Sequence, residues 1–173
     1  MKRAILLILI GVVLMSASSI ARKPPNEVFY PVTIDKLGEF ITAMEYKYDK
    51  ITTSEGGERL NFRIKGDNGV YDVNVLLFES IDIVYIYVGK YLNLPLEDEL
   101  TGFMLSYLMT KNWELTFGKL EWDINDGEVR LSHTLPIDDG MSKQTFQAYL
   151  STLMNVADNL IPDLREAMDS FSE

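Results

Sequence analysis

Two runs of alternating polarity meet at a tight turn between residues 118 and 135. Polar and apolar side chains alternate along residues 118–124 and again along residues 128–135, with Asn125-Asp126-Gly127 between them. Such turn residues tolerate the backbone angles of a hairpin, and alternation with a period of two predicts strands with one buried face. The segment therefore predicts an antiparallel hairpin, anchored in the core by Trp122 and Leu131 and followed by a long amphipathic helix.

The rest of the pattern predicts helices around a sheet. Helical spacing indicates a first helix over residues 34–44 capped by Thr33, a second with Pro95 in its first turn, and a third capped by Ser142 and kinked at Pro162. Strands are expected at residues 60–64, 71–77 and 81–88, and a short strand at residues 46–52 is left open. The strand at 81–88 is apolar on both faces, so it should lie centrally under helices. We predict an α+β fold with a mainly antiparallel sheet of about five strands, in the order α-β-β-β-α-β-β-α.

Residues 1–21 have the features of a secretory signal peptide. Lys2 and Arg3 precede an apolar run, and Ser19 and Ala21 suit a cleavage site after Ala21. Cleavage would place the mature protein in the periplasm or outside the cell. The alternative is an uncleaved anchor, although the run is shorter than the roughly 20 residues of a membrane span. Residues 22–32 are expected to form a linker, and residues 33–173 a single domain.

The charge of the chain limits its partners. The formal net charge is −10, and removal of Lys2 and Arg3 with the signal would make it −12. So acidic a chain repels phosphate backbones and anionic lipids, which argues against nucleic acid and against membrane binding after cleavage. The sequence contains no Cys. Disulfides are therefore excluded, and packing alone must stabilise the domain.

The sequence shows no catalytic motif. His133 is the only histidine, and it shares a strand face with Val129, Leu131 and Leu135, which predicts a packed position. No Gly-x-Ser-x-Gly elbow is present to support a Ser-His-Asp set. A small exported hydrolase that uses His133 with a nearby acid and hydroxyl is kept as an alternative, and no cofactor is predicted.

Metal sites are not predicted either. One His and no Cys exclude the common zinc sites. The acids around Asp126 resemble part of a calcium loop, but Gly127 falls at the fifth position of an EF-hand loop instead of the sixth, and Thr134 replaces the bidentate Glu. We interpret these acids as turn residues.

Aromatic and Met side chains are numerous, and most are expected in the core. The alternative is an apolar groove or dimer face, because these residue types are enriched at recognition surfaces. The second helix would supply that partner or dimer surface, formed by Phe103, Met104, Tyr107, Leu108, Met109 and Trp113.

The hairpin resembles that of a known family. Asn112, residues 118–123 and residues 126–130 are similar to the "Asn … Gly-Lys-aromatic … Asp-Gly-Glu-Val" hairpin of the YbjN-like proteins, and the helix at residues 158–164 is similar too. The resemblance implies the fold of type III secretion chaperones, which commonly dimerises, and it names no catalytic residue. The export signal and Trp122 depart from the family pattern.

The resemblance and the residues together predict a function without chemistry. We expect a non-enzymatic exported homodimer that binds a protein or peptide partner and has a chaperone-like role. The alternative that the resemblance implies is a regulatory or envelope-stress factor without a stable client.

Overall fold

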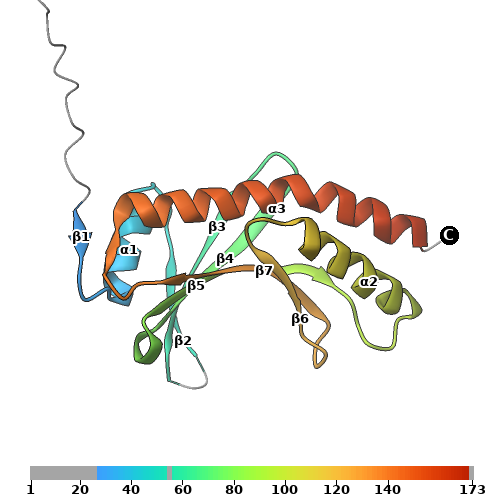
Figure 1. The fold of residues 1–173 in the computed structure, drawn as a ribbon, viewed down its shortest axis with the longest axis horizontal. Helices are drawn as coiled ribbons and strands as arrows, with labels where there is room; N and C mark the ends of the chain where they lie inside the picture. Colours follow the sequence, from blue (N-terminus) through green and yellow to red (C-terminus); the bar gives the residue numbers. More distant parts are fainter. Residues whose placement is uncertain (1–26, 54–55, 172–173) are drawn as a thin grey trace, which may run out of the picture.

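A computed structural model describes residues 27–53 and 56–171 of the chain (Figure 1). Its main sheet is antiparallel throughout and has the strand order β2-β3-β4-β5-β7-β6. The strands are β2 (Asp49–Thr52), β3 (Glu58–Lys65), β4 (Val70–Phe78), β5 (Ile83–Asn93), β6 (Lys119–Trp122) and β7 (Glu128–Pro136). The helices are α1 (Ile34–Thr42), α2 (Glu99–Glu114) and α3 (Lys143–Phe171), with a short 3-10 turn, η1 (Glu79–Ile81), before β5. The predicted α+β class is confirmed, and the sheet has six strands.

Helices cover one face of the sheet. α3 runs along this face, with α1 beside its first turns and α2 beside its second half (Figure 1). Val88 pairs with Leu131, and Val84 pairs with Leu135, so that these buried side chains form adjacent rows beneath α3. The alternate positions of β5, among them Tyr85 and Tyr87, point to the other face. β5 is therefore central, but helices cover it on one side only.

Side-chain caps fix where the helices begin. Thr33 accepts a hydrogen bond from the Lys36 amide (3.2 Å), and Ser142 accepts one from the Thr145 amide (3.0 Å), as predicted. The prediction for the second helix is corrected, because α2 begins at Glu99, after Pro95, and Asp98 is its N-cap. The Asp98 carboxylate accepts a hydrogen bond from the Leu100 amide (2.9 Å). This cap stabilises a helix that begins four residues after Pro95.

α3 continues through Pro162 as one helix of 29 residues. At the rise of an α-helix, that length corresponds to about 44 Å. Its inner face is buried along the whole length, by Phe146, Leu150, Leu153, Ala157, Leu160, Ile161 and Leu164. This continuous apolar stripe explains how the helix spans both the sheet and α2.

The segment before α1 packs against the domain. β1 (Val28–Phe29) pairs with β8 (Met141–Ser142), and Val32 is buried in the core. These residues fall within the stretch that the sequence assigns to a linker. The predicted signal peptide lies outside the described residues.

The turn between β6 and β7 is built as predicted. Asp123 accepts from the Asn125 amide (2.9 Å), and Asp126 accepts from the Glu128 amide (3.0 Å). Gly127 has a φ of 74°, and a Cβ there would lie 2.8 Å from the backbone of Leu94. Glycine is required because the turn packs directly on the end of β5, and its acids serve the turn.

Candidate partner-binding surfaces

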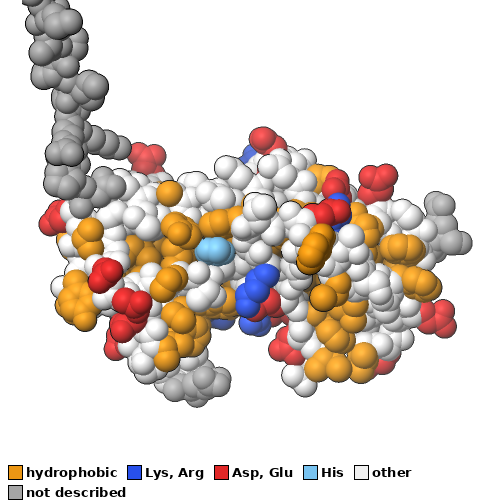
Figure 2. All heavy atoms as spheres, in the orientation of Figure 1, with side chains coloured by type: hydrophobic (Ala, Val, Ile, Leu, Met, Phe, Trp, Pro, Cys, Tyr) orange, Lys and Arg blue, Asp and Glu red, His pale blue; other side chains and the backbone are white. Residues whose placement is uncertain are grey.

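The outward face of α2 exposes large apolar side chains. Phe103 is 63% exposed, Met109 69% and Trp113 91%. Figure 2 shows hydrophobic side chains gathered over the region of α2, with acidic side chains around the rim. A helix that is apolar on both its inner and outer faces is typical of a helix with neighbours on both sides.

Between Gly102 and Trp113 the same face carries no charge, and Glu99 lies at its N-terminal end. Between the large side chains lie Gly102, Ser106 and Thr110, spaced four residues apart. The Ser106 hydroxyl donates to the Gly102 carbonyl (3.2 Å), and the Thr110 hydroxyl donates to the Ser106 carbonyl (3.2 Å). Because both hydroxyls are satisfied within the helix, this face is largely apolar. We name residues 102, 103, 106, 109, 110 and 113 the outer face of α2.

The structure divides the six residues of the predicted surface. Phe103, Met109 and Trp113 lie on the outer face, and Tyr107 is half-buried toward α3. Met104 and Leu108, which are 0% and 4% exposed, lie in the core, and this corrects the predicted set. They are one helical turn apart on the inner side of α2, so they cannot meet a partner.

A groove between α2 and α3 was not predicted. It consists of two cavities of about 370 Å³ and about 330 Å³ that share Asp163 as a wall residue. Lys111 of α2 crosses it and lies 3.3 Å from Asp163 and 3.4 Å from Glu114. Burial lowers the pKa of Lys111, but the hydrogen bonds to Asp163 and Glu114 together raise it by more than burial lowers it. The net shift of the Lys111 pKa is therefore upward. The acids of α3 were visible in the sequence, but their position beside α2 depends on the tertiary fold.

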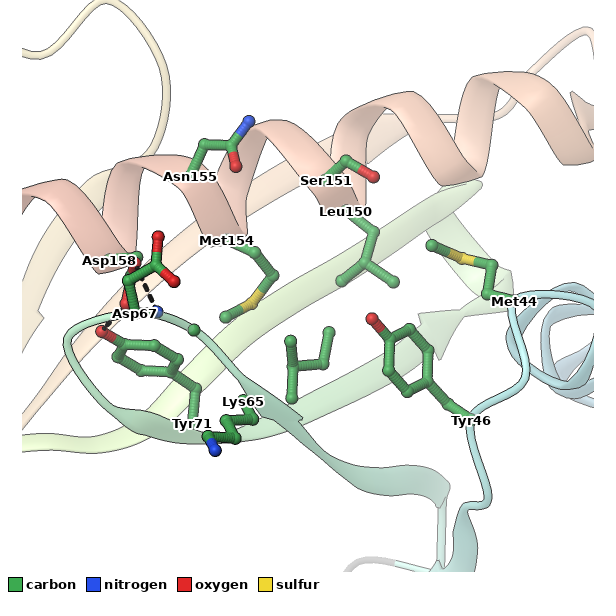
Figure 3. Close-up of a pocket in the computed structure, with 12 residues that line it drawn as sticks. Met44, Tyr46, Lys65, Asp67, Tyr71, Leu150, Ser151, Met154, Asn155 and Asp158 are labelled. Carbon is green, nitrogen blue, oxygen red and sulfur yellow. Dashed lines mark hydrogen bonds between the residues drawn. The ribbon is translucent and has the colours of Figure 1, made fainter.

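A separate cavity, of about 500 Å³, lies between α3 and the β3–β4 hairpin (Figure 3). Met44, Tyr46 and Met154 contribute apolar walls. At one end the Asp158 carboxylate accepts hydrogen bonds from the Asp67 amide (2.9 Å), the Asn68 amide (2.9 Å) and the Tyr71 hydroxyl (2.7 Å).

The bonds to Asp158 have an electrostatic consequence. The Tyr71 hydroxyl and the Asn68 amide hold the pKa of the Asp158 carboxyl below its usual value. The carboxylate therefore fastens the hairpin to α3 in its charged form, and its oxygens are already engaged by the protein.

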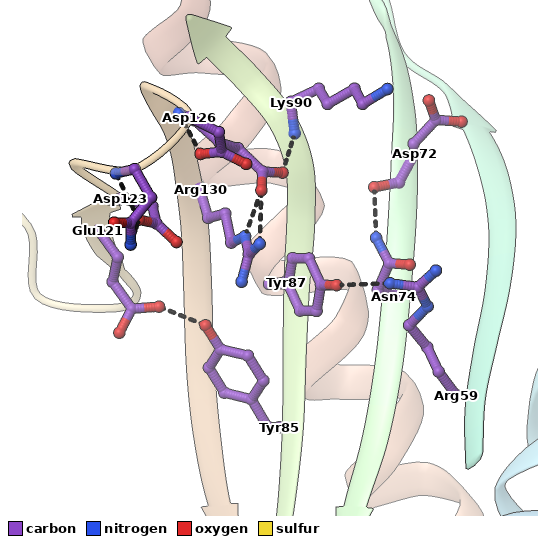
Figure 4. A network of polar contacts seen from close by, with 12 residues as sticks. Arg59, Asp72, Asn74, Tyr85, Tyr87, Lys90, Glu121, Asp123, Asp126 and Arg130 are labelled. Atoms are coloured by element: carbon purple, nitrogen blue, oxygen red, sulfur yellow. Dashed lines mark hydrogen bonds and ion pairs between the residues drawn. The ribbon is translucent and has the colours of Figure 1, made fainter. Parts of the chain in front are cut away.

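The face of the sheet away from the helices carries a polar network (Figure 4). Arg59 donates to the Tyr87 hydroxyl (3.2 Å), and the Arg130 guanidinium lies 4.8 Å from the centre of the Tyr87 ring. Arg130 is in turn bonded to Glu128. Nearby, Tyr85 donates to Glu121, and burial followed by this hydrogen bond raises the pKa of Tyr85. These side chains bond to one another and cover the sheet without a helix, and among the described residues Arg59 Nε is left buried without a hydrogen-bond partner.

His133 packs among rings, as predicted. Its imidazole stacks on Phe117 with ring centres 3.9 Å apart, and Tyr149 lies 5.4 Å away. Burial lowers its pKa. Among residues 27–53 and 56–171, His133 has no hydrogen bond to a hydroxyl or carboxylate, so the arrangement that a hydrolase would need is not formed there.

The described segments also lack other kinds of site. No group of three or more His, Asp or Glu side chains in residues 27–53 and 56–171 is placed to hold a metal ion. Within the same segments, no helix combines the length and apolar character needed to cross a membrane.

Asn112, one of the residues on which the resemblance rests, links α2 to the hairpin. Its side-chain amide donates to the Leu120 carbonyl (3.0 Å), and its carbonyl accepts from the Leu120 amide (2.7 Å). A side chain thus replaces a neighbouring strand at the outer edge of β6. Strand pairing with another chain is blocked at this position, because both backbone groups of Leu120 are occupied.

Comparison with known proteins agrees with the family resemblance. Residues 33–166 match the model of the YbjN family, described as "Putative bacterial sensory transduction regulator". The fold is similar to that in "Crystal structure of YbjN, a putative transcription regulator from E. coli", with a TM-score of 0.61 and 12% identity over 81% of this chain and 96% of that chain. At this identity the likeness shows the fold alone.

Two complexes match less closely. "Structure of the HopA1-SchA Chaperone-Effector Complex" gives a TM-score of 0.47 and 15% identity over 79% of this chain and 99% of that chain. "Crystal Structure of the ExsC-ExsE Complex" gives 0.43 and 15% over 74% and 90%. No curated protein matches the chain.

Proposed function

This chain belongs to the YbjN family, and from that premise we propose that it is a non-enzymatic exported protein that binds a protein or peptide partner through α2. The observation that carries the proposal is the outer face of α2, where three large apolar side chains are exposed and no charged residue lies between Gly102 and Trp113. Exposed apolar clusters of this kind mark interaction sites in soluble proteins.

A second copy of the chain fits the outer face. Two molecules of net charge −10 repel each other, so a contact between copies needs a surface free of acids. The outer face meets this requirement. Small residues at its centre allow two helices to approach closely, and Met109 and Trp113 add apolar area at the rim of the contact. We therefore include a homodimer in the proposal, in which a second copy and a different protein are alternative occupants of the outer face.

Export is part of the proposal because of the signal-like segment at residues 1–21. A cleaved product in the periplasm or outside the cell is expected, and N-terminal sequencing of the purified protein would test it. A product that begins at Arg22 supports cleavage after Ala21. Retention of Met1 would favour an anchored protein.

A second candidate function is regulation without a stable client. The description of the family as a sensory transduction regulator favours it. On this alternative the partner would be transient, and α2 would still be its docking surface.

The proposal is tested by capturing partners with the immobilised full chain. Extracts from the producing cell are passed over the wild-type protein and over Trp113→Glu, and the bound proteins are identified by mass spectrometry. We expect one or a few proteins to bind the wild type and to be lost with the variant, because a charge on the outer face must be desolvated in the contact.

The matched control is Ile81→Glu, which places the same charge on an exposed apolar residue of η1. This variant should retain the partner. If both variants capture the same proteins as the wild type, α2 is not the binding surface and the proposal is wrong.

A further inference from the structure

The groove between α2 and α3 has an apolar floor that meets the outer face of α2 only at Phe103. Leu115 and Val156 line one cavity, and Tyr107 and Ala167 line the other. Phe171 of α3 stacks on Phe103 of α2, with ring centres 5.5 Å apart, at the far end. The floor thus continues from the end of α2 to the last residues of α3.

The rim of this groove is acidic. Glu114, Asp163 and Glu166 line it, and Lys111 is its one basic residue. Lys111 is already engaged by Glu114 and Asp163. Glu166 has no basic partner within the part of the chain that the structure describes. The groove therefore combines an apolar floor with uncompensated negative charge.

We propose that the α2–α3 groove binds a basic amphipathic segment of a partner protein. This inference rests on the proposed function, and it adds the chemistry of the partner. Amphipathic helices commonly bind by laying an apolar face into such a groove. Apolar side chains of the segment would cover Leu115, Val156 and Ala167, while its Lys or Arg side chains would reach Glu166 and the neighbouring acids. Charge of opposite sign also speeds the encounter.

Electrostatics make the proposal specific. An acidic segment would meet both the rim and the overall negative charge of the chain, so it should be rejected. Binding of the basic segment should weaken as salt rises, because exposed charge pairs are screened over about 8 Å at physiological ionic strength.

The test uses two labelled synthetic peptides of about 18 residues, or five helical turns. Both carry leucines along one helical face; the other face carries lysines in one peptide and glutamates in the second. Fluorescence anisotropy with the full chain should show saturable binding of the lysine peptide only. Glu166→Lys should weaken that binding about fivefold, from the loss and reversal of one rim charge.

The control is Asp139→Lys, which changes the net charge equally in the connection between β7 and β8, far from the groove. It should bind the lysine peptide as the wild type does. Equal binding of the two peptides, no binding of either, or equal effects of the two substitutions would each overturn the proposal. If cell extracts still yield a partner whose capture survives Glu166→Lys, partner binding stands and only the groove inference falls.

Discussion

The two tryptophans of this chain occupy opposite environments. Trp122 packs on the core, and its indole N–H donates to the Leu94 carbonyl (3.0 Å). Trp113 is 91% exposed on the outer face of α2. Since both are tryptophans, they form a matched pair for separating stability from binding.

We expect Trp122→Ala to lower the free energy of unfolding by about 2–4 kcal/mol, through lost packing and one lost hydrogen bond. Trp113→Ala should change it by less than about 0.5 kcal/mol. Urea unfolding of both variants, at a protein concentration too low for association, makes the comparison. Equal losses would mean that Trp122 does not face the core.

Asp158 makes a prediction about pH. Its carboxyl pKa is lowered in the folded protein, mainly by the Tyr71 hydroxyl and the Asn68 amide. Its contribution to stability is therefore present above the usual carboxyl pKa of about 3.9 and is lost as pH falls through the lower folded value. The difference in unfolding free energy between wild type and Asp158→Asn should be largest at neutral pH and should shrink in acid.

Tyr71→Phe is the control for this prediction. Tyr71→Phe removes the hydroxyl that lowers the pKa of Asp158 most. In a protein that carries Tyr71→Phe, the effect of Asp158→Asn on the unfolding free energy should therefore depend less on pH. Denaturant unfolding between pH 3 and pH 7 measures both effects. A difference that stays constant over this range would show that Asp158 does not fasten the hairpin in its charged form.

At the residue scale, local signals were readable where short-range chemistry determines the outcome. The caps at Thr33 and Ser142 and the turn at Asn125-Asp126-Gly127 depend on neighbours within a few residues, and the sequence predicted them. Contacts made across the fold, such as Asp158 with the Asn68 amide, have no local signature.

At the element scale, α2 shows the limit of pattern analysis. Its apolar residues surround the helix, so their spacing does not separate the core positions Met104 and Leu108 from the exposed positions Met109 and Trp113. The strands were easier, because alternation with a period of two assigns each side chain to a face. The partner surface of α2 remains a prediction, now restricted to its outer face.

Asn112 of α2 makes two hydrogen bonds to Leu120 of the edge strand β6, and we call this pair of bonds the Asn112 clamp. Asn112→Ala leaves the amide and carbonyl of Leu120, a buried residue, without partners. We expect a loss of about 2–3 kcal/mol in unfolding free energy, together with a greater tendency to aggregate from the freed strand edge.

Thr110→Ala is the comparison for Asn112→Ala, because Thr110 is an exposed α2 residue whose hydroxyl bonds only within its own helix. It should cost less than about 0.5 kcal/mol. Thermal unfolding with turbidity detection follows stability and aggregation together. An Asn112→Ala protein as stable as Thr110→Ala would contradict the role of the clamp.

At the scale of the whole molecule, charge and apolar surface predict two contacts with opposite salt dependence. Acidic copies that meet through the uncharged outer face of α2 repel each other elsewhere, so added salt should strengthen self-association. A basic segment in the acidic groove should bind more weakly as salt rises. Sedimentation measures self-association and fluorescence anisotropy measures binding of the basic segment, each at low and at physiological salt. If salt changed both in the same direction, this assignment of the two surfaces would be contradicted.

The central claim, that another chain covers the outer face of α2, is tested most directly by molar mass. Multi-angle light scattering at micromolar concentration should give twice the chain mass for the wild type and for Ile81→Glu, and the mass of a single chain for Trp113→Glu. A wild type that stays monomeric at every concentration and salt, or a Trp113→Glu protein that remains dimeric, would contradict the account.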